Sequence, residues 1–259
     1  MNYAKKSLGQ NFLIDKNIIK KIVSLSDIKN KNVIEIGPGT GAITNEILEK
    51  KPKSLILIEK DNYLFKKLKN IYKEKKVVEV LNHDILKFNL EDKVKSNSII
   101  FGNLPYNISS QILVKILKFK RWPPKFKEVI FMFQKELGEK ITGKYLTSNY
   151  SRLSILTNYR LKVINKFLIK NNCFFPKPKI NSVILHFEPI KKNLIKIKNI
   201  NNLEKITNIL FSNKRKMINK NIRKLFLDLK NVSFLNLNLR PSEISPEIYY
   251  KITNLYEKN

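Results

Sequence analysis

Short apolar segments alternate with segments of helical periodicity along most of this 259-residue chain. Runs of about five apolar residues, each ended by glycine or polar residues, are typical of strands buried on both faces. Strands that alternate with helices form right-handed βαβ units, so the sequence predicts an α/β fold whose parallel sheet is covered on both faces. The predicted strands are 32–36, 54–58, 77–81, 98–101 and 128–133, with helices beginning near Asp15, after the loop 37–41, at Asp61 and at Ser109.

Two further strand candidates, 161–169 and 182–187, are separated by a stiff turn at 174–178 and could pair as an antiparallel edge. Beyond about residue 190 the strand-like runs stop, and apolar residues recur at helical spacing. There, Ser245-Pro246 has the residues typical of the start of a last helix. We therefore expect a main domain over 1–190, whose first eleven residues are polar, and a small helical domain over 191–259.

The charge balance indicates a polyanionic partner. The chain carries 51 Lys plus Arg against 21 Asp plus Glu, a net charge of +30, and 191–259 alone holds fifteen basic and five acidic residues. Such an excess is typical of proteins that bind nucleic acids. The alternative is compositional drift, because Lys, Asn and Ile are frequent throughout the chain, and charge alone does not name the nucleic acid.

Cysteine content and apolar run length argue against several classes of protein. Cys173 is the only cysteine and the chain has two histidines, so an internal disulfide is impossible and no zinc site is expected. No apolar run approaches the roughly 20 residues of a membrane span, and the polar start lacks the apolar core of a secretory signal. We expect a cytoplasmic protein without a metal and without a membrane partner.

Glycine is scarce, with seven in the chain, yet Gly37, Gly39 and Gly41 fall together directly after the first predicted strand. A ligand that lies across strand ends needs a turn without Cβ atoms, and the N-terminus of the next helix supplies N–H groups. In the dinucleotide fingerprint G-x-G-x-x-G the third glycine comes one residue later than it does here. The loop therefore indicates a nucleotide-like cofactor, and an ordinary turn is the alternative.

Acidic residues end the next two predicted strands. Glu59 comes 22 positions after Gly37, close to the spacing at which a carboxylate accepts ribose hydroxyls. Asp84 could accept a hydrogen bond from an adenine amino group. Taken alone, Glu59 could be a solvated charge and Asp84 a helix cap. Together with the glycine loop, these strand ends predict an adenosine-bearing cofactor in the crevice of a doubly wound sheet.

The segment Asn103-Leu104-Pro105-Tyr106 follows the fourth strand and indicates chemistry on an amino group. A purine amino nitrogen is a poor nucleophile because its lone pair is delocalised into the ring. The Asn103 side-chain oxygen and a backbone carbonyl, assigned to Leu104, can accept its two hydrogens and localise that lone pair. Pro105 stiffens the backbone, and Tyr106 can stack on the base, which is worth about 1–3 kcal/mol. The alternative is a simple loop with a buried tyrosine.

Two further candidates lie later in the chain. Phe174 could cover the opposite face of the base, although aromatic residues before a proline turn more often belong to the core. In the helical domain, eleven positions hold six basic residues and no acidic one, which favours phosphate contact over an ordinary solvated face. These residues are Lys214, Arg215, Lys216, Lys220, Arg223 and Lys224.

In their order along the chain, these motifs resemble one family. The segments 8–13, 35–41, 101–109, 133–136, 150–154 and 174–182, together with Glu59 and Asp84, are similar to the ribosomal RNA adenine N6,N6-dimethyltransferases. Within this family, the chain most resembles the bacterial small-subunit enzymes, the kasugamycin-resistance methylases. The resemblance covers almost the whole chain, including 211–216 and 240–245. One departure is Ser151, where many relatives carry glycine.

The resemblance implies a Rossmann-like class I methyltransferase domain with an N-terminal segment that covers the cofactor, followed by a basic RNA-binding helical domain. It implies methylation, twice each, of N6 of two adjacent adenosines near the 3′ end of small-subunit rRNA. We expect a monomer that acts on this RNA within a 30S-like particle. The implied cofactor is S-adenosylmethionine, with site residues Asn11, Leu13, Gly37, Gly39, Glu59, Asp84 and Asn103.

Positioning alone suits this chemistry, because the sulfonium supplies the electrophile and the nitrogen can lose its proton after attack without a general base. Two alternatives remain. The related large-subunit methylases of macrolide resistance share most motifs, but they commonly read Asn-Ile-Pro-Tyr where this chain has Leu104, and they lack the Leu8-Gly9 pair. A non-catalytic ribosome-assembly or transcription factor could keep the fold without the activity, but we would expect it to have lost Asn103 or Tyr106.

Overall fold

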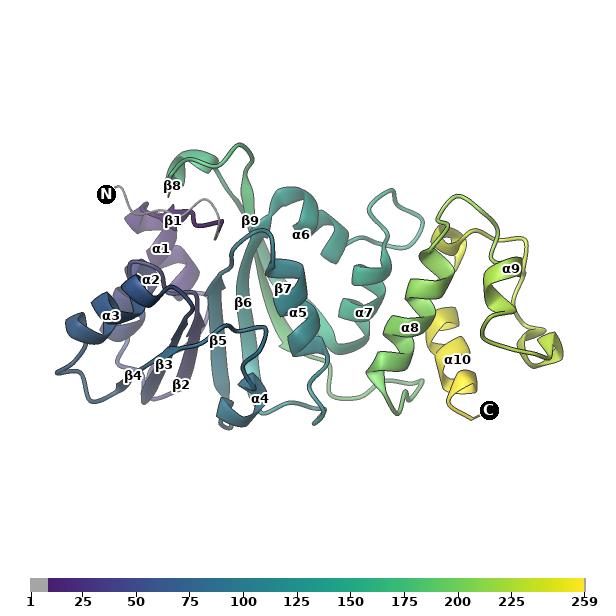
Figure 1. Cartoon of the computed structure of the whole chain (residues 1–259), viewed down its shortest axis with the longest axis horizontal. Coiled ribbons are helices and arrows are strands. Elements are labelled where there is room, and N and C mark those ends of the chain that lie inside the picture. The colour runs from purple at the N-terminus through teal and green to yellow at the C-terminus, as the bar shows by residue number, and fades with distance from the viewer. Residues whose placement is uncertain (1–8, 259) are drawn as a thin grey trace. The chain divides into compact units, whose positions relative to one another are not determined.

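The computed structural model of the chain describes residues 9–258 (Figure 1). Leu8, which belongs to the first motif, and the rest of 1–8 lie outside the described residues. By their packing the described residues form two compact units. The first contains the chain through Gly138 together with Val163–Pro189, and the second contains Glu139–Lys162 and the chain from Ile190 onward.

A seven-stranded sheet forms the centre of the first unit, with strand order β4-β3-β2-β5-β6-β9-β7. The strands are β2 (Asn32–Ile36), β3 (Ser54–Glu59), β4 (Val78–Asn82), β5 (Ser98–Asn103), β6 (Phe126–Gln134), β7 (Leu161–Ile169) and β9 (Ser182–Pro189). Strands β2 to β6 pair in parallel, and β9 pairs antiparallel with β6. The predicted α/β fold with a parallel sheet is confirmed, and the two predicted edge strands are the neighbours β7 and β9.

Helices lie on both faces of this sheet (Figure 1). Helices α1 (Lys16–Val23), α2 (Ala42–Glu49) and α3 (Asn62–Ile71) lie on one face, and α5 (Ser109–Leu117) lies on the other, with the short α4 (Leu90–Lys93) before it in the chain. Because side chains alternate along a strand, Val33 and Phe101 join Ile22 and Ile47 in one buried apolar cluster, while Ile100 points to the opposite face.

Two of the predicted helix starts have a direct cause in the sequence. Asp15 Oδ1 accepts hydrogen bonds from the backbone nitrogens of Asn17 and Ile18 at 2.9 and 3.0 Å. Asp61 Oδ1 does the same for Tyr63 and Leu64 at 2.9 and 3.1 Å. These bonds satisfy N–H groups that the first helical turn leaves without partners. The predicted starts of α1 and α3 are therefore confirmed.

A separate two-stranded sheet holds the start of the described chain. β1 (Phe12–Leu13) pairs antiparallel with β8 (Phe174–Phe175), so that Leu13 lies opposite Phe174 and Phe12 opposite Phe175. Successive strand residues point to opposite sides. Leu13 and Phe174 are therefore buried at 3% exposure each, while Phe175 stays 40% exposed.

The second unit is helical. It contains α7 (Arg152–Arg160), α8 (Ile200–Phe211), α9 (Asn219–Ile222) and α10 (Pro246–Tyr256), and α6 (Lys135–Ile141) leads into it. Buried tyrosines organise its core: Tyr150 Oη donates to the Ile244 oxygen at 2.9 Å, and Tyr249 stacks on Phe211 at 5.8 Å between ring centroids. Within residues 9–258, no helix is long and apolar enough to cross a bilayer.

The division between the units differs from the predicted boundary at 190 in one segment. By packing, 139–162 groups with the helical unit rather than with the first unit, because α7 packs on α8 and α10. The last two residues of this segment are also the first two of β7. Ser151 lies in this segment and begins α7, where its Oγ accepts from the Ser154 nitrogen at 3.3 Å. Its φ of −153° is extended backbone that any residue adopts. The position therefore does not require glycine.

Candidate active site

Strands β2 and β5 are neighbours, and the strand order runs outward in opposite directions from them. Doubly wound sheets bind ligands at such a switch point, in the crevice beyond the carboxyl ends of the strands. The glycine loop leaves β2 here and Asn103 ends β5, so that a Cβ on Gly37 would lie 3.7 Å from the Asn103 backbone oxygen. A pocket of about 1130 Å³, part of it open to solvent, occupies this edge and is also lined by residues 9–13.

The glycine loop needs its glycines. Gly37, Gly39 and Gly41 have φ values of 68°, 59° and 87°, which residues with a Cβ rarely adopt. A Cβ on Gly39 would meet the Phe12 ring at 3.0 Å. Helix α2 begins directly after the loop without a side-chain cap, and Ala42 and Ile43 line the pocket. The first N–H groups of α2 are therefore available to a ligand.

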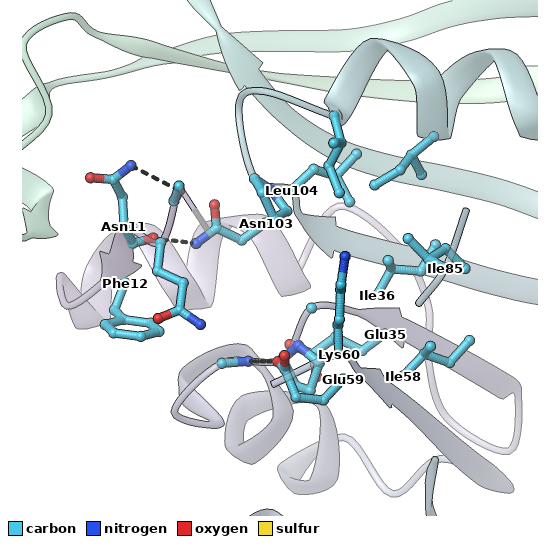
Figure 2. Close-up of a pocket in the computed structure, with 18 of the residues that line it drawn as sticks. Asn11, Phe12, Glu35, Ile36, Ile58, Glu59, Lys60, Ile85, Asn103 and Leu104 are labelled. Atoms are coloured by element: carbon cyan, nitrogen blue, oxygen red, sulfur yellow. Dashed lines mark hydrogen bonds between the residues drawn. The ribbon is translucent and has the colours of Figure 1, made fainter. Parts of the chain in front are cut away.

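Glu59, the last residue of β3, is buried and held at the pocket by two backbone groups. Its Oε2 accepts from the Gly39 nitrogen at 3.1 Å (Figure 2), and its Oε1 accepts from the Asp61 nitrogen at 2.8 Å. Burial raises the pKa of Glu59, and these two N–H groups oppose that rise. Each carboxylate oxygen keeps a second lone pair, so the fixed side chain can still accept from two hydroxyl groups.

Glu35 also lines this corner, although the sequence analysis noted it only as the first residue of the glycine motif. It is 1% exposed and accepts from Thr44 Oγ1 at 2.6 Å. Burial raises the pKa of Glu35 to about 8, and the nearby Glu59 adds to the shift. Glu35 is therefore mainly protonated at neutral pH, which removes repulsion between neighbouring carboxylates. The signal in the sequence is an acid within an otherwise apolar strand.

The Asn103 side chain is oriented by a backbone group from the start of the chain. Its Nδ2 donates to the Asn11 carbonyl oxygen at 3.0 Å (Figure 2). Its Oδ1 therefore remains an acceptor at the pocket. The Leu104 side chain is buried, and its backbone oxygen accepts no hydrogen bond from any residue in 9–258. Two acceptors, one from a side chain and one from the backbone, thus adjoin at the end of β5.

Tyr106 lines the same pocket and is held by a residue that the sequence analysis did not single out. A hydrogen bond of 2.5 Å joins its Oη to Ser182 Oγ, at the start of β9. Burial raises the pKa of Tyr106, so the phenol is neutral at physiological pH. Ser182 belongs to the quoted segment 174–182, but no local pattern links it to a tyrosine 76 positions earlier.

Asp84 follows β4 and is tied at both oxygens. Its Oδ2 lies 2.9 Å from Lys60 Nζ, and its Oδ1 accepts from the Leu86 nitrogen at 3.0 Å. The hydrogen bond from Lys60 is the main cause that lowers the pKa of Asp84. Asp84 lines the pocket and also caps the following turn, so both interpretations of this residue describe part of its environment.

Phe174 is the predicted site residue that the structure does not bring to the pocket. Its ring is buried in the core opposite Leu13 and is absent from the pocket wall. The expectation that Phe174 covers the opposite face of the base is therefore corrected, because in this arrangement its ring packs in the core and does not line the pocket. The reason is the register of β1 and β8, which turns Phe174 inward and Phe175 outward. The alternative interpretation, a core aromatic, describes its position.

The six basic residues of 214–224, called here the basic segment, lie in the second unit. All six are exposed, in the turn after α8 and in and after α9. None of them forms an ion pair with an acidic side chain of residues 9–258. Their charge is therefore available to a partner.

Comparison with known proteins decides the family. The family of ribosomal RNA adenine dimethylases matches residues 1–258. The chain belongs to this family. Ribosomal RNA small subunit methyltransferase A of Pelagibacter ubique (strain HTCC1062) is 46% identical over 98% of this chain and 97% of the relative. The protein of the same name from Malacoplasma penetrans (strain HF-2) is 38% identical over 96% and 91%.

Solved structures agree with this membership in the rRNA adenine dimethylase family. A dimethyladenosine transferase from Plasmodium falciparum superposes with a TM-score of 0.77 at 26% identity, over 95% of this chain and 98% of that one. The 23S rRNA methyltransferase ErmE, at 22% identity, has the same fold, with a TM-score of 0.66 over 95% and 99%. The dimethylase described here is thus a class I methyltransferase, and its methyl donor is S-adenosylmethionine.

The pocket fits this donor on its own chemistry. The glycine loop leaves room where Cβ atoms would collide, and Glu59 presents a fixed carboxylate in a buried corner. Among residues 9–258 no group of three His, Cys, Asp or Glu side chains could hold a metal ion.

Proposed function

We propose that this dimethylase modifies small-subunit rRNA within a 30S-like particle, at N6 of two adjacent adenosines near the 3′ end, each methylated twice. The names of the relatives from P. ubique and M. penetrans, which match along nearly their whole length, support the choice of subunit. Leu104 in the Asn-Leu-Pro-Tyr segment supports it against the large-subunit alternative. We further propose that the protein acts as a monomer in the cytoplasm.

Each residue at the cofactor end of the pocket has a role in this proposal. Glu59 would accept the ribose hydroxyls and Asp84 the adenine amino group, while the backbone of Gly37 and Gly39 would border the cofactor. Asn11 and Leu13 would cover it from the β1 side. When bound, S-adenosylmethionine supplies a methyl group on a positively charged sulfonium.

The observation that carries the proposed mechanism is the hydrogen bond from Asn103 Nδ2 to the Asn11 carbonyl. Because Nδ2 is committed, Oδ1 faces the reacting group as an acceptor. Oδ1 and the Leu104 carbonyl would then accept the two amino hydrogens of the target adenine and localise the nitrogen lone pair. The nitrogen loses its proton after methylation, so no side chain has to act as a base. Catalysis is mainly positioning.

Tyr106 would hold the target base, which has to leave its stack to reach the pocket. Stacking on an aromatic ring contributes about 1–3 kcal/mol per base. Ser182 fixes the phenol end of this ring. Phe174 would contribute by packing behind β1 and Leu13 rather than by touching the base.

The basic segment would bind rRNA phosphates. Lys214, Arg215 and Lys216 are exposed and form no ion pair with residues 9–258, and phosphate contacts by such side chains gain affinity from released counterions.

The test is incubation of the protein with isotopically labelled S-adenosylmethionine and small subunits that lack the modification, followed by nucleoside analysis and mapping. Label should appear as N6,N6-dimethyladenosine at two adjacent positions near the 3′ end of the small-subunit RNA. Unmodified large subunits serve as the matched second substrate. Label in the large-subunit RNA alone would support the macrolide-resistance alternative, and label in neither RNA would contradict the proposal.

A further inference from the structure

Lys60 lies immediately after Glu59 and projects from beside it into the open centre of the pocket (Figure 2). Its Nζ lies 2.9 Å from Asp84 Oδ2, with the Lys60 side chain 55% exposed and the Asp84 side chain 20% exposed. The cofactor pocket therefore contains a cation that the proposed function has not used, and its partner is the carboxylate assigned to the adenine.

The bonding around Asp84 leaves little freedom for its carboxylate. Lys60 binds Oδ2, and the Leu86 backbone nitrogen binds Oδ1 at 3.0 Å. One partner at each end fixes the plane of the group, whereas the Leu86 bond alone would let it rotate about that contact. A carboxylate oxygen can accept two hydrogen bonds. A lone pair on each oxygen therefore remains, in a fixed direction, for a further donor.

A second lysine near Asp84 offers a natural comparison. Lys87 also lowers the pKa of Asp84 by its charge, and its backbone nitrogen donates to the Asp84 backbone oxygen at 3.0 Å, but its side chain forms no hydrogen bond or ion pair with the Asp84 carboxylate. Lys60 differs from Lys87 in the direct contact of its side chain with that carboxylate and in lining the pocket. An effect of charge alone would be shared by both lysines, and an effect of orientation would belong to Lys60.

We propose that Lys60 is a positioning residue for the adenine of the cofactor, which acts by holding the Asp84 carboxylate in the orientation that accepts the 6-amino group. This inference rests on the proposed contact between Asp84 and adenine. It makes Lys60 a determinant of specificity, because an orientation that favours an N–H donor gives no advantage to a purine without one.

The test measures binding by calorimetry on the full chain with two probes. One is S-adenosylhomocysteine, and the other is its analogue with unsubstituted purine in place of adenine. Lys60→Met should weaken binding of the adenine compound about two- to fivefold, the range for an exposed ion pair, and leave binding of the purine analogue unchanged. Lys60→Arg should restore most of the loss. Lys87→Met is the matched control and should change neither affinity.

The double variant Lys60→Met/Asp84→Ala separates this inference from the proposed function, because alanine leaves no side-chain oxygen at position 84. If Lys60 acts through Asp84, removing Lys60 from the Asp84→Ala protein should cost no further affinity. Equal losses for both probes, additive losses in the double variant, or tighter binding by Lys60→Met would overturn the role of Lys60. If Asp84→Ala itself leaves the preference for adenine intact, the contact between Asp84 and adenine is wrong, and the proposed cofactor assignment fails first.

Discussion

Glu59 and Asn103 at the pocket are each held by backbone atoms, with Glu59 buried and bonded to two N–H groups and Asn103 tied to Asn11. Lys214 and its neighbours in the basic segment are exposed and form no ion pair with residues 9–258. The pocket thus depends on where single atoms lie, whereas the basic segment depends on how much charge it carries. A single substitution at the pocket should strongly lower the rate or the cofactor affinity. In the basic segment, each substitution should lower RNA affinity a little, and the losses should add up.

The largest effect is expected at Asn103. Asn103→Ala removes the oriented acceptor at the reacting nitrogen, and misplacement at a reacting group typically costs about a hundredfold or more in rate. Single-turnover methylation should fall by that factor, while affinity for the RNA stays near that of the unchanged protein. Binding of RNA by the variant, together with a melting temperature near that of the unchanged protein, checks that it is folded. A variant with the original single-turnover rate would remove Asn103 from the mechanism.

The next effect is expected at the cofactor. Glu59→Ala removes the charged hydrogen bonds to the ribose. One such bond is worth about 1.5–3 kcal/mol, so affinity for S-adenosylmethionine should fall by at least about tenfold to a hundredfold. Calorimetry measures it. Glu49→Ala, at an exposed position at the end of α2 in the same unit, is the matched control and should bind normally. Unchanged affinity in Glu59→Ala would show that the ribose is held elsewhere.

The basic segment should respond through its salt dependence. RNA affinity falls linearly on a log–log salt plot with a slope of about −0.7 to −0.9 per phosphate neutralised. Changing Lys214, Arg215 and Lys216 together to Gln should flatten that slope by about two to three units, a relative change of roughly ten- to thirtyfold between 0.1 and 0.3 M salt. Cofactor affinity should stay the same.

The control for this experiment removes the same charge from the first unit, by changing Lys73, Lys75 and Lys76, which are exposed after α3. Their variant should keep the original slope. If neither triple variant changes the slope, the basic segment is a solvated face and compositional drift explains its charge. Equal flattening by both would mean that binding follows net charge rather than this segment.

The smallest effect is a pH dependence of stability from Glu35. Its folded pKa is about 8 against 4.5 for the free side chain, so between these values the folded protein holds one more proton than the unfolded chain. The contribution of Glu35 to the free energy of unfolding is fully present below about pH 4.5, and it declines as the pH rises toward 8. In Glu35→Gln this decline should vanish, and its melting temperature relative to the unchanged protein should rise by a few degrees from pH 5.5 to 7.5. The melting temperature of Glu49→Gln should change with pH in the same way as that of the unchanged protein. If Glu35→Gln also follows the unchanged protein, Glu35 is not protonated in the folded state.

The edge of the sheet that holds the pocket could be predicted because the carboxyl ends of parallel strands meet there. Gly37, Glu59, Asp84 and Asn103 lie at the carboxyl ends of four different strands, and all four line one pocket. That they share an edge follows from the alternation of strands and helices, which local apolar patterns predict. Their roles toward cofactor and base remain predictions.

Contacts between distant segments could not be predicted in the same way. Whether Phe174 or Phe175 faces inward depends on the register of the two-residue strand β8 against β1. A strand of two residues is too short for the periodicity of its sequence to predict that register. The bond between Tyr106 and Ser182 joins residues 76 positions apart. The placement of 139–162 in the helical unit depends on which surface its apolar residues cover. The helical pattern of this segment would be the same whether it packed on the sheet or on the other helices.

The carbonyl of Asn11 that orients Asn103 has a consequence for how this enzyme tolerates mutation. A backbone oxygen is present whatever side chain position 11 carries, so side-chain scanning cannot remove the contact and would record the segment as unimportant to this step. Deletion, or replacement of the peptide bond by an ester, acts on the atom itself. For this contact, what matters is the path of the backbone that leads into β1 along β8, and not the side chain at position 11.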